Sequence, residues 1–276
     1  MPRFLIVDGY DATGRQALTA SGATLAGHLY RRMLAGLRPN AKMDILYAAD
    51  RALPEKDLSA YDAMFWTGSS LTIYHQTAEV SQQIELARAA FRLGLPAFGS
   101  CWALQIACVA AGGSCRKNPK GREFGLTRQL QTTPRGARHR VLANRDAPFM
   151  GFTSHFDEVE SLPQGTEGLL TNTMTQVQAA DIHHENGQFF AVQYHPEYDF
   201  SEIAALARFR ADGLIKDATF ADEASLQEFI AACEAVHRTP DNADLRHQLN
   251  IDDSVLDQAC RQNELRNWLD LHFREN

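Results

Sequence analysis

Residues 93–113 read LGLPAFGSCWALQIACVAAGG, a strand-turn-helix pattern from which the rest of the fold can be built up. Residues 93–99 form a short apolar run bounded by glycine and proline, which is typical of a buried parallel strand. Residues 102–111 are almost all apolar and stop at a glycine pair, as a buried helix would. Cys101 is left on the turn, where the free N–H groups of the helix N-terminus favour a reactive thiolate.

A second informative segment lies almost a hundred residues later, where residues 193–197 read QYHPE. In extended chain, side chains two positions apart point to the same side, so His195 and Glu197 are expected to face each other. Pro196 between them cannot extend a strand ladder and marks the end of a strand. A carboxylate beside an imidazole fixes the tautomer of the ring and stabilises its protonated form.

The two segments together supply the parts of a thiol enzyme. The chain has five cysteines, and most free cysteines are small buried hydrophobic residues, so Cys101 alone is a weak signal. With His195 as the base and Glu197 as its partner, Cys101 is predicted to be a nucleophile. The backbone N–H of Trp102 directly follows it and is the expected donor to an oxyanion.

Around these segments, strands and helices alternate through the first two thirds of the chain, which favours an α/β fold with a mainly parallel sheet. A hairpin is expected between residues 177–183 and 188–194. The other expected strands are 4–7, 43–47 and 63–66, and the expected helices are 24–37 and 78–93.

After residue 197 the pattern becomes helical, over residues 200–213, 224–237 and 254–273. Asp252 and Ser254 are placed to cap the last of these helices. We expect the helices to act as a buttress on the sheet. An alternative is a docking surface for a partner or for a second copy in a homo-oligomer.

Composition excludes several classes of protein. The formal net charge of −7 gives no support to nucleic-acid binding, and no apolar run approaches the roughly 20 residues of a membrane helix. The first strand begins directly after Met1-Pro2-Arg3 and leaves no room for a signal peptide. Cysteines without framework spacing fit a reducing cytoplasm. The pair His183-His184 would point to opposite faces of a strand, so no metal site is expected.

These motifs, together with Arg122-Glu123-Phe124-Gly125 and the segment 154–159 (SHFDEV), resemble the class I glutamine amidotransferases of the triad type, especially the amidotransferase domain of GMP synthetase. The resemblance covers about residues 3–200. It implies a flavodoxin-like three-layer domain over residues 1–200, with residues 201–276 as a helical extension packed on it. It also implies that Gln105 and the backbone at Ser154 and His155 hold the glutamine substrate, with no cofactor.

One loop departs from the pattern of that family. Its members usually carry a Gly-Gly-Pro-like loop after the third strand, which gives the second oxyanion donor. Here residues 67–71 read TGSSL, with Gly68 at the flexible position and Ser69 as the expected donor. Since this loop can flip in the family, activity is expected to depend on a substrate or partner that sets it.

Three functions remain open from the sequence. The chain has no phosphate-binding or pyrophosphatase loop, so the first is a glutaminase that supplies ammonia to a separate synthase subunit. The second is a stand-alone γ-glutamyl hydrolase or peptidase that uses the same triad. The third is a non-catalytic regulatory module, which the complete triad disfavours. The small-molecule substrate is then glutamine or another γ-glutamyl compound.

Overall fold

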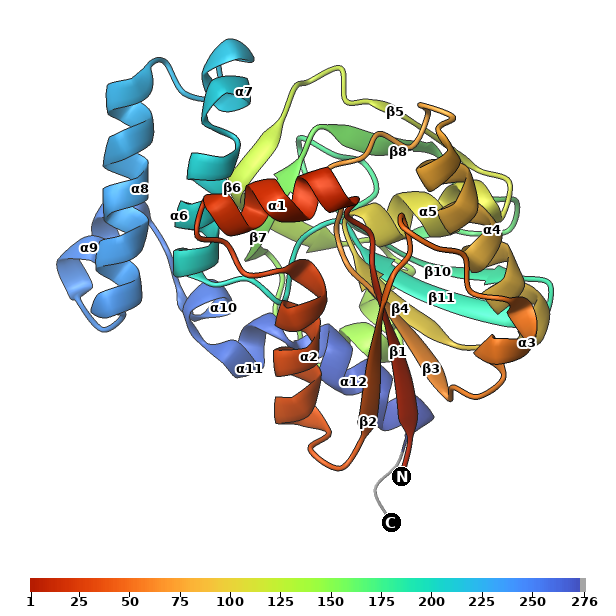
Figure 1. The fold of residues 1–276 in the computed structure, drawn as a ribbon. Coiled ribbons are helices and arrows are strands. Elements are labelled where there is room, and N and C mark those ends of the chain that lie inside the picture. Colours follow the sequence, from red (N-terminus) through yellow and green to blue (C-terminus); the bar gives the residue numbers. More distant parts are fainter. Residues whose placement is uncertain (274–276) are drawn as a thin grey trace.

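The computed structural model describes residues 1–273 and has one large sheet at its centre (Figure 1). The nine strands of this sheet follow the order β2 (Lys42–Tyr47), β1 (Arg3–Asp8), β3 (Ala63–Trp66), β4 (Ala97–Ser100), β11 (Gly187–Val192), β10 (Ala179–His184), β9 (Gly168–Thr171), β6 (Glu123–Thr132) and β7 (Phe149–His155). The first five strands in this order, from β2 through β11, are parallel to one another. Each pair after that, from β11 and β10 through β6 and β7, is antiparallel. The expected α/β class is confirmed. A separate ribbon pairs β5 (Ser114–Lys117) with β8 (Asp157–Ser161).

Helices cover both faces of the sheet and continue into a group at one side (Figure 1). The first face carries α3 (Glu55–Leu58), α4 (Ala78–Leu93) and α5 (Trp102–Ala110), and the second carries α2 (Ala26–Leu37) and α12 (Asn263–His272). The remaining helices are α1 (Ala12–Ala20), α6 (Phe200–Phe209), α7 (Ala211–Lys216), α8 (Glu223–Arg238), α9 (Ala243–Leu249), α10 (Asp253–Leu256) and α11 (Gln258–Arg261), with short 3₁₀ turns η1 (Gly136–Arg138) and η2 (Arg140–Leu142). None of the helices within residues 1–273 is long and apolar enough to cross a membrane.

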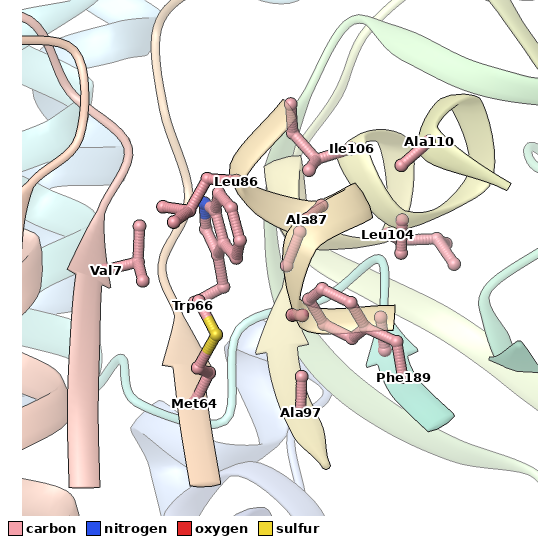
Figure 2. Packing of buried hydrophobic residues seen from close by; sticks show 14 of the residues in the cluster. Val7, Met64, Trp66, Leu86, Ala87, Ala97, Leu104, Ile106, Ala110 and Phe189 are labelled. Atoms are coloured by element: carbon pink, nitrogen blue, oxygen red, sulfur yellow. The ribbon is translucent and has the colours of Figure 1, made fainter. Parts of the chain in front are cut away.

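The core on the first face fixes the helix that follows Cys101. Side chains of α4 and α5 pack on those of the parallel strands, including Trp66 and Phe189, whose ring centroids lie 6.0 Å apart (Figure 2). Every residue of α5 except Val109 is buried. A helix that is apolar on all sides is stable only when it is enclosed, so the sequence of α5 itself holds it against the sheet.

The core on the second face is shared between the sheet and the last helix. Trp268 of α12 is fully buried, and its ring lies 5.5 Å from that of Phe65 and 6.0 Å from that of Phe98. Leu265 and Leu269 belong to the same cluster. The division at residue 200 therefore stays a prediction, and we propose that residues 1–273 fold as a single unit in which α12 supplies part of the core.

Several elements differ from the sequence predictions. The expected helix 254–273 is three helices, because Asp257 caps a new helix by accepting from the Cys260 N–H at 2.8 Å. The expected helix 200–213 breaks at Arg210, between α6 and α7. Helix α1, capped by Asp11, was not predicted, and neither was α9. The other predicted strands and the helix 78–93 are confirmed, with the last hairpin strand ending at Val192. The strand predicted over residues 93–99 begins only at Ala97, because α4 runs to Leu93 and Gly94 ends it.

Candidate active site

Cys101 occupies a strained turn between β4 and α5. Its φ of 54° and ψ of −98° lie outside the regions that residues with a Cβ prefer, at a cost of about 1–3 kcal/mol. The turn is so tight that only glycine fits at position 99, because a Cβ there would lie 2.3 Å from the Cβ of Ala103. The Cys101 N–H donates to the carbonyl oxygen of Val192 at 2.7 Å. This bond joins the cysteine turn to the end of β11, just before the second motif.

His195 and Glu197 lie beyond the end of β11, in a turn rather than on a strand. The prediction that both side chains sit on extended chain is wrong, because the turn at Pro196 ends the strand early. The pairing that it implied is nevertheless present. His195 Nδ1 and Glu197 Oε1 are 2.7 Å apart and both side chains are buried. The imidazole also stacks on the ring of Tyr198, at 4.0 Å between centroids.

The other imidazole nitrogen, Nε2, is buried and has no hydrogen-bond partner within residues 1–273. A Cβ built at Gly68 would lie 2.9 Å from His195 Cε1 and 3.9 Å from the Cβ of Cys101, so the thiol and the ring converge over this glycine. Burial works against the protonated imidazole, but the charges of Glu197 and Cys101 outweigh it. They raise the pKa of His195 from 6.5 to about 9.

A chain of buried hydroxyl groups continues the line from His195 and Glu197. Ser100 Oγ donates to Glu197 Oε1 at 2.9 Å, and the Tyr30 hydroxyl donates to Ser100 Oγ at 2.8 Å. Both donors are fully buried. Ser100, which Tyr30 holds in turn, therefore fixes the orientation of the Glu197 carboxylate.

A cavity of about 170 Å³ lies over the Cys101 turn. In addition to Cys101, five of the residues predicted from the sequence line this cavity: Ser69, Trp102, Gln105, Ser154 and His155. Cys101 Sγ lies 4.0 Å from the carbonyl oxygen of Ser154. The remaining predicted residues, Gly68, His195 and Glu197, are not among those that line the cavity. The roles of the lining residues as oxyanion and substrate contacts stay predictions.

Hydroxyl groups fix the loop that carries Gly68 and Ser69. Ser69 Oγ donates to the carbonyl oxygen of Gly9 at 2.8 Å and accepts from the Leu71 N–H at 3.1 Å. Thr67 Oγ1 donates to the carbonyl oxygen of Gly68 at 2.8 Å. The serine at position 69 therefore has a structural role, because its side chain holds the loop in place beside Cys101.

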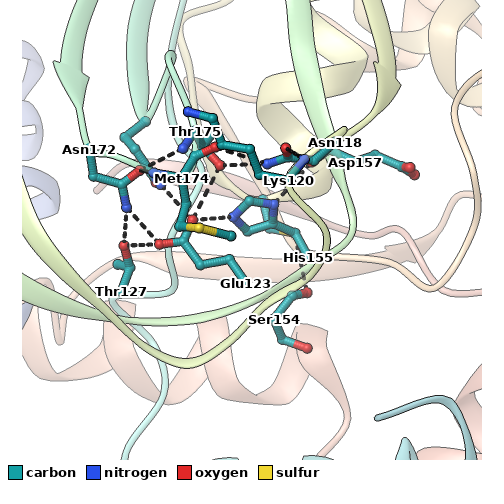
Figure 3. Close-up of polar contacts among 12 residues, drawn as sticks. Asn118, Lys120, Glu123, Thr127, Ser154, His155, Asp157, Asn172, Met174 and Thr175 are labelled. Carbon is teal, nitrogen blue, oxygen red and sulfur yellow. Dashed lines mark hydrogen bonds and ion pairs between the residues drawn. The ribbon is translucent and has the colours of Figure 1, made fainter. Parts of the chain in front are cut away.

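The side chain of His155 points into a buried polar network (Figure 3). Its Nε2 lies 3.1 Å from Glu123 Oε2, and its Nδ1 lies 3.0 Å from the carbonyl oxygen of Asp157. Although burial opposes the charged form, His155 and neighbouring donors hold the pKa of Glu123 below its usual value. Only the backbone of His155 is therefore free to meet a substrate. The other donors to Glu123 are Thr127, Asn172, Thr175 and Gln178.

Sequence reasoning missed several residues of the site. Arg122 and Arg210 line the cavity, and so do Tyr74 and Asp157, which are hydrogen-bonded to each other at 2.9 Å. Arg122 belongs to the quoted Arg-Glu-Phe-Gly segment, which was a usable signal. Arg210 lies in the helical extension, where no motif marks it. Among residues 1–273, no group of three or more His, Cys, Asp or Glu side chains could hold a metal ion.

Comparisons with known proteins agree with this geometry. The sequence model of the family "Glutamine amidotransferase class-I" matches residues 39–209. A Pseudomonas protein, gamma-glutamyl-L-1-hydroxyisopropylamide hydrolase, is 30% identical over 97% of this chain and 92% of its own length. The chain belongs to the class I glutamine amidotransferase family, as the motifs predicted.

Other relatives match less completely. A GMP synthase of Wolinella succinogenes is 29% identical over 51% of this chain and only 25% of its own length. Among solved structures, a glutamine amidotransferase from Thermotoga maritima has a TM-score of 0.66 at 14% identity, over 99% of both chains. A putative GMP synthase component from Thermoplasma acidophilum has a TM-score of 0.56 at 17% identity, over 86% of this chain and 98% of its own. At these identities the structures support the fold alone.

Proposed function

We propose that this protein hydrolyses a γ-glutamyl amide through a covalent thioester on Cys101. One observation carries the proposal. The imidazole of His195 and the side chain of Cys101 converge over Gly68; the buried Nε2 of the ring has no hydrogen-bond partner within residues 1–273, while Nδ1 is held by Glu197 at 2.7 Å. A base that is oriented on one nitrogen and free on the other is what activation of a thiol requires.

The reaction follows from this geometry in two steps. The Cys101 thiolate attacks the side-chain amide carbon, and the N–H groups of Trp102 and Ser69 receive the charge that develops on oxygen. His195 gives the proton on Nε2 to the leaving nitrogen, and the carbon–nitrogen bond breaks. His195 then takes a proton from water, which attacks the thioester. Glutamate leaves, and Cys101 returns to its starting form.

A substituted γ-glutamyl amide is favoured over glutamine as the substrate. The relative that matches this chain almost from end to end is named for such an amide, whereas the GMP synthase of Wolinella matches over a quarter of its own length. The sequence alone favoured glutamine and a synthase partner. That function remains the second candidate, supported by the partial sequence match to the GMP synthase of Wolinella.

A panel of substrates separates the two candidates. We expect the purified protein to release glutamate from γ-glutamyl alkylamides with a kcat/KM at least roughly tenfold above that for glutamine, because one substituent contact is worth about 1–3 kcal/mol. Glutamate release is measured enzymatically, with Cys101→Ala protein as the blank. A preference for glutamine would reverse the choice and direct attention to a synthase.

The pKa of His195 predicts the pH dependence. Since protonated His195 serves the leaving nitrogen, kcat/KM is expected to hold up to about pH 9 and to fall above it. Glu197→Gln removes a charge that raises this pKa, so the fall should begin at lower pH. The pKa of His195 is higher in the folded protein than in the unfolded chain. The stability that protonated His195 provides is therefore complete below about pH 6.5 and is lost as pH rises through about 9. If the fall of kcat/KM begins at the same pH in Glu197→Gln protein as in the native protein, the group that titrates is not His195.

A further inference from the structure

Arg210 brings to the cavity a positive charge that no carboxylate of the described residues neutralises. It lies at the junction of α6 and α7, and its side chain lines the same cavity as Cys101. No carboxylate within residues 1–273 lies within 4.0 Å of its guanidinium group, and its buried Nε has no hydrogen-bond partner there. The neighbouring arginines differ, because Arg122 pairs with Asp217 at 2.6 Å and Arg208 pairs with Glu234. A buried donor without a partner is costly, so a ligand acceptor is expected here.

Phe209 and Ala211, on either side of Arg210, pack against the apolar cluster that holds Tyr10 and Tyr198. Tyr198 stacks on the His195 ring, and Tyr198 and Tyr10 belong to one apolar cluster with α6. Burial raises the pKa of Tyr10 to about 12, and the charge of Arg210 together with a hydrogen bond between the two side chains acts against this rise. Burial also raises the pKa of the Tyr198 hydroxyl, and the charge of Arg210 opposes this rise as well. The guanidinium group is therefore close to both tyrosines and, through Tyr198, to the imidazole.

The side of His195 is the side of the leaving group. His195 protonates the nitrogen that departs, so the amine part of the substrate lies next to this ring. The residues expected to hold the glutamyl part, Gln105 and Ser154, come from α5 and β7 instead. Beyond Arg210 a second hollow of about 290 Å³ continues along α7 and shares Arg122 and Arg210 with the first. The site thus has room for more than ammonia next to the guanidinium group.

We propose that Arg210 binds a carboxylate on the leaving amine, so that the preferred substrates are γ-glutamyl amides of amino acids. This inference rests on the proposed function. A carboxylate is the partner that a guanidinium group binds most strongly, through two parallel hydrogen bonds. It would give the Arg210 guanidinium group an acceptor on the leaving side of the scissile bond, where neither glutamine nor an unsubstituted alkylamide carries a carboxylate.

Three matched substrates test the proposal. The γ-glutamyl amides of isopropylamine, of 2-aminopropan-1-ol and of alanine share one branched carbon skeleton and differ in carrying a methyl, a hydroxymethyl or a carboxylate group. We expect the native protein to favour the alanine compound over the isopropylamide by roughly 10- to 100-fold in kcat/KM, the range of a charge-assisted hydrogen bond. The hydroxyl compound should fall between them. This order is measured without any substitution.

Variants then assign the preference to Arg210. Arg210→Met keeps the length of the side chain and removes the charge, so the alanine compound should lose its advantage while the isopropylamide changes little. Arg210→Lys should restore part of the advantage. Arg238→Met removes an exposed arginine of α8 and should keep the native order. Melting temperatures of all variants show that the comparison is made on folded protein.

The other outcomes are distinguishable. An equal loss on all three substrates in Arg210→Met would place Arg210 on the shared glutamyl part and overturn the proposal. A native preference for the hydroxyl compound or the isopropylamide would also overturn it. Turnover of none of the three, or of glutamine alone, would instead reject the proposed function on which it rests.

Discussion

Cys101→Ala is expected to abolish glutamate release, with kcat reduced roughly 10⁴-fold or more, as removal of a nucleophile does in other triad enzymes. The reason is chemical rather than structural. Alanine keeps the Cβ, so the strained backbone at φ 54° and the bond to the Val192 carbonyl oxygen are unchanged. The buried α5 helix remains in place. The melting temperature should therefore stay close to that of the native protein while activity disappears.

The matched control is Cys260→Ala, which removes an exposed cysteine far from the site in sequence and should leave turnover intact. His195→Ala should lose nearly as much activity as Cys101→Ala, because it removes the proton carrier. Glu197→Gln should cost less, since it disturbs the charge and orientation of the imidazole but leaves the ring. Full activity in folded Cys101→Ala protein would reject the thioester mechanism.

Trp268→Ala is expected to lower the free energy of unfolding by about 3–5 kcal/mol, the usual cost of removing a large buried aromatic ring. Trp268 is fully buried and packs edge-on against Phe65 and Phe98. Both phenylalanines lie on central strands, so the cavity would open under the strand that leads to Cys101. Urea denaturation followed by circular dichroism measures the loss.

The matched variant is Trp268→Phe. The indole N–H of Trp268 is buried without a hydrogen-bond partner in the described residues, so phenylalanine removes volume and also an unsatisfied donor. Its cost should stay below about 1.5 kcal/mol. If Trp268→Ala unfolds at the native urea midpoint, α12 contributes little to the core and the single folding unit proposed above is wrong.

The catalytic residues could be predicted because their chemistry is written in short local patterns. Cys101 stands between an apolar strand and an apolar helix, and residues 195–197 combine a base with a carboxylate. Arg210 could not be predicted in this way. It reaches the cavity only because α6 ends there, and Phe209-Arg210-Ala211 carries no signal of a binding site.

The fold shows the same difference between local and distant information. Helix 78–93 was predicted to the residue, because Thr77 caps its start and Gly94 ends it in the left-handed conformation. The tail was predicted as longer helices, since Asp257 looks like a helical surface residue until its side chain is seen to cap α11. Tertiary packing also turns His155 toward Glu123, which lies 32 positions away.

The place of α12 in the core has a consequence for how the protein is made. The last strand of the sheet ends at Val192, and 71 positions separate it from Asn263, where α12 begins. At about 5–20 residues per second, a ribosome needs roughly 4 to 14 s to cover that distance. During this interval Phe65 and Phe98 lack the Trp268 ring that packs on them in the folded protein. A nascent chain is therefore exposed to aggregation until late in synthesis, and chaperone supply should govern the yield of expression.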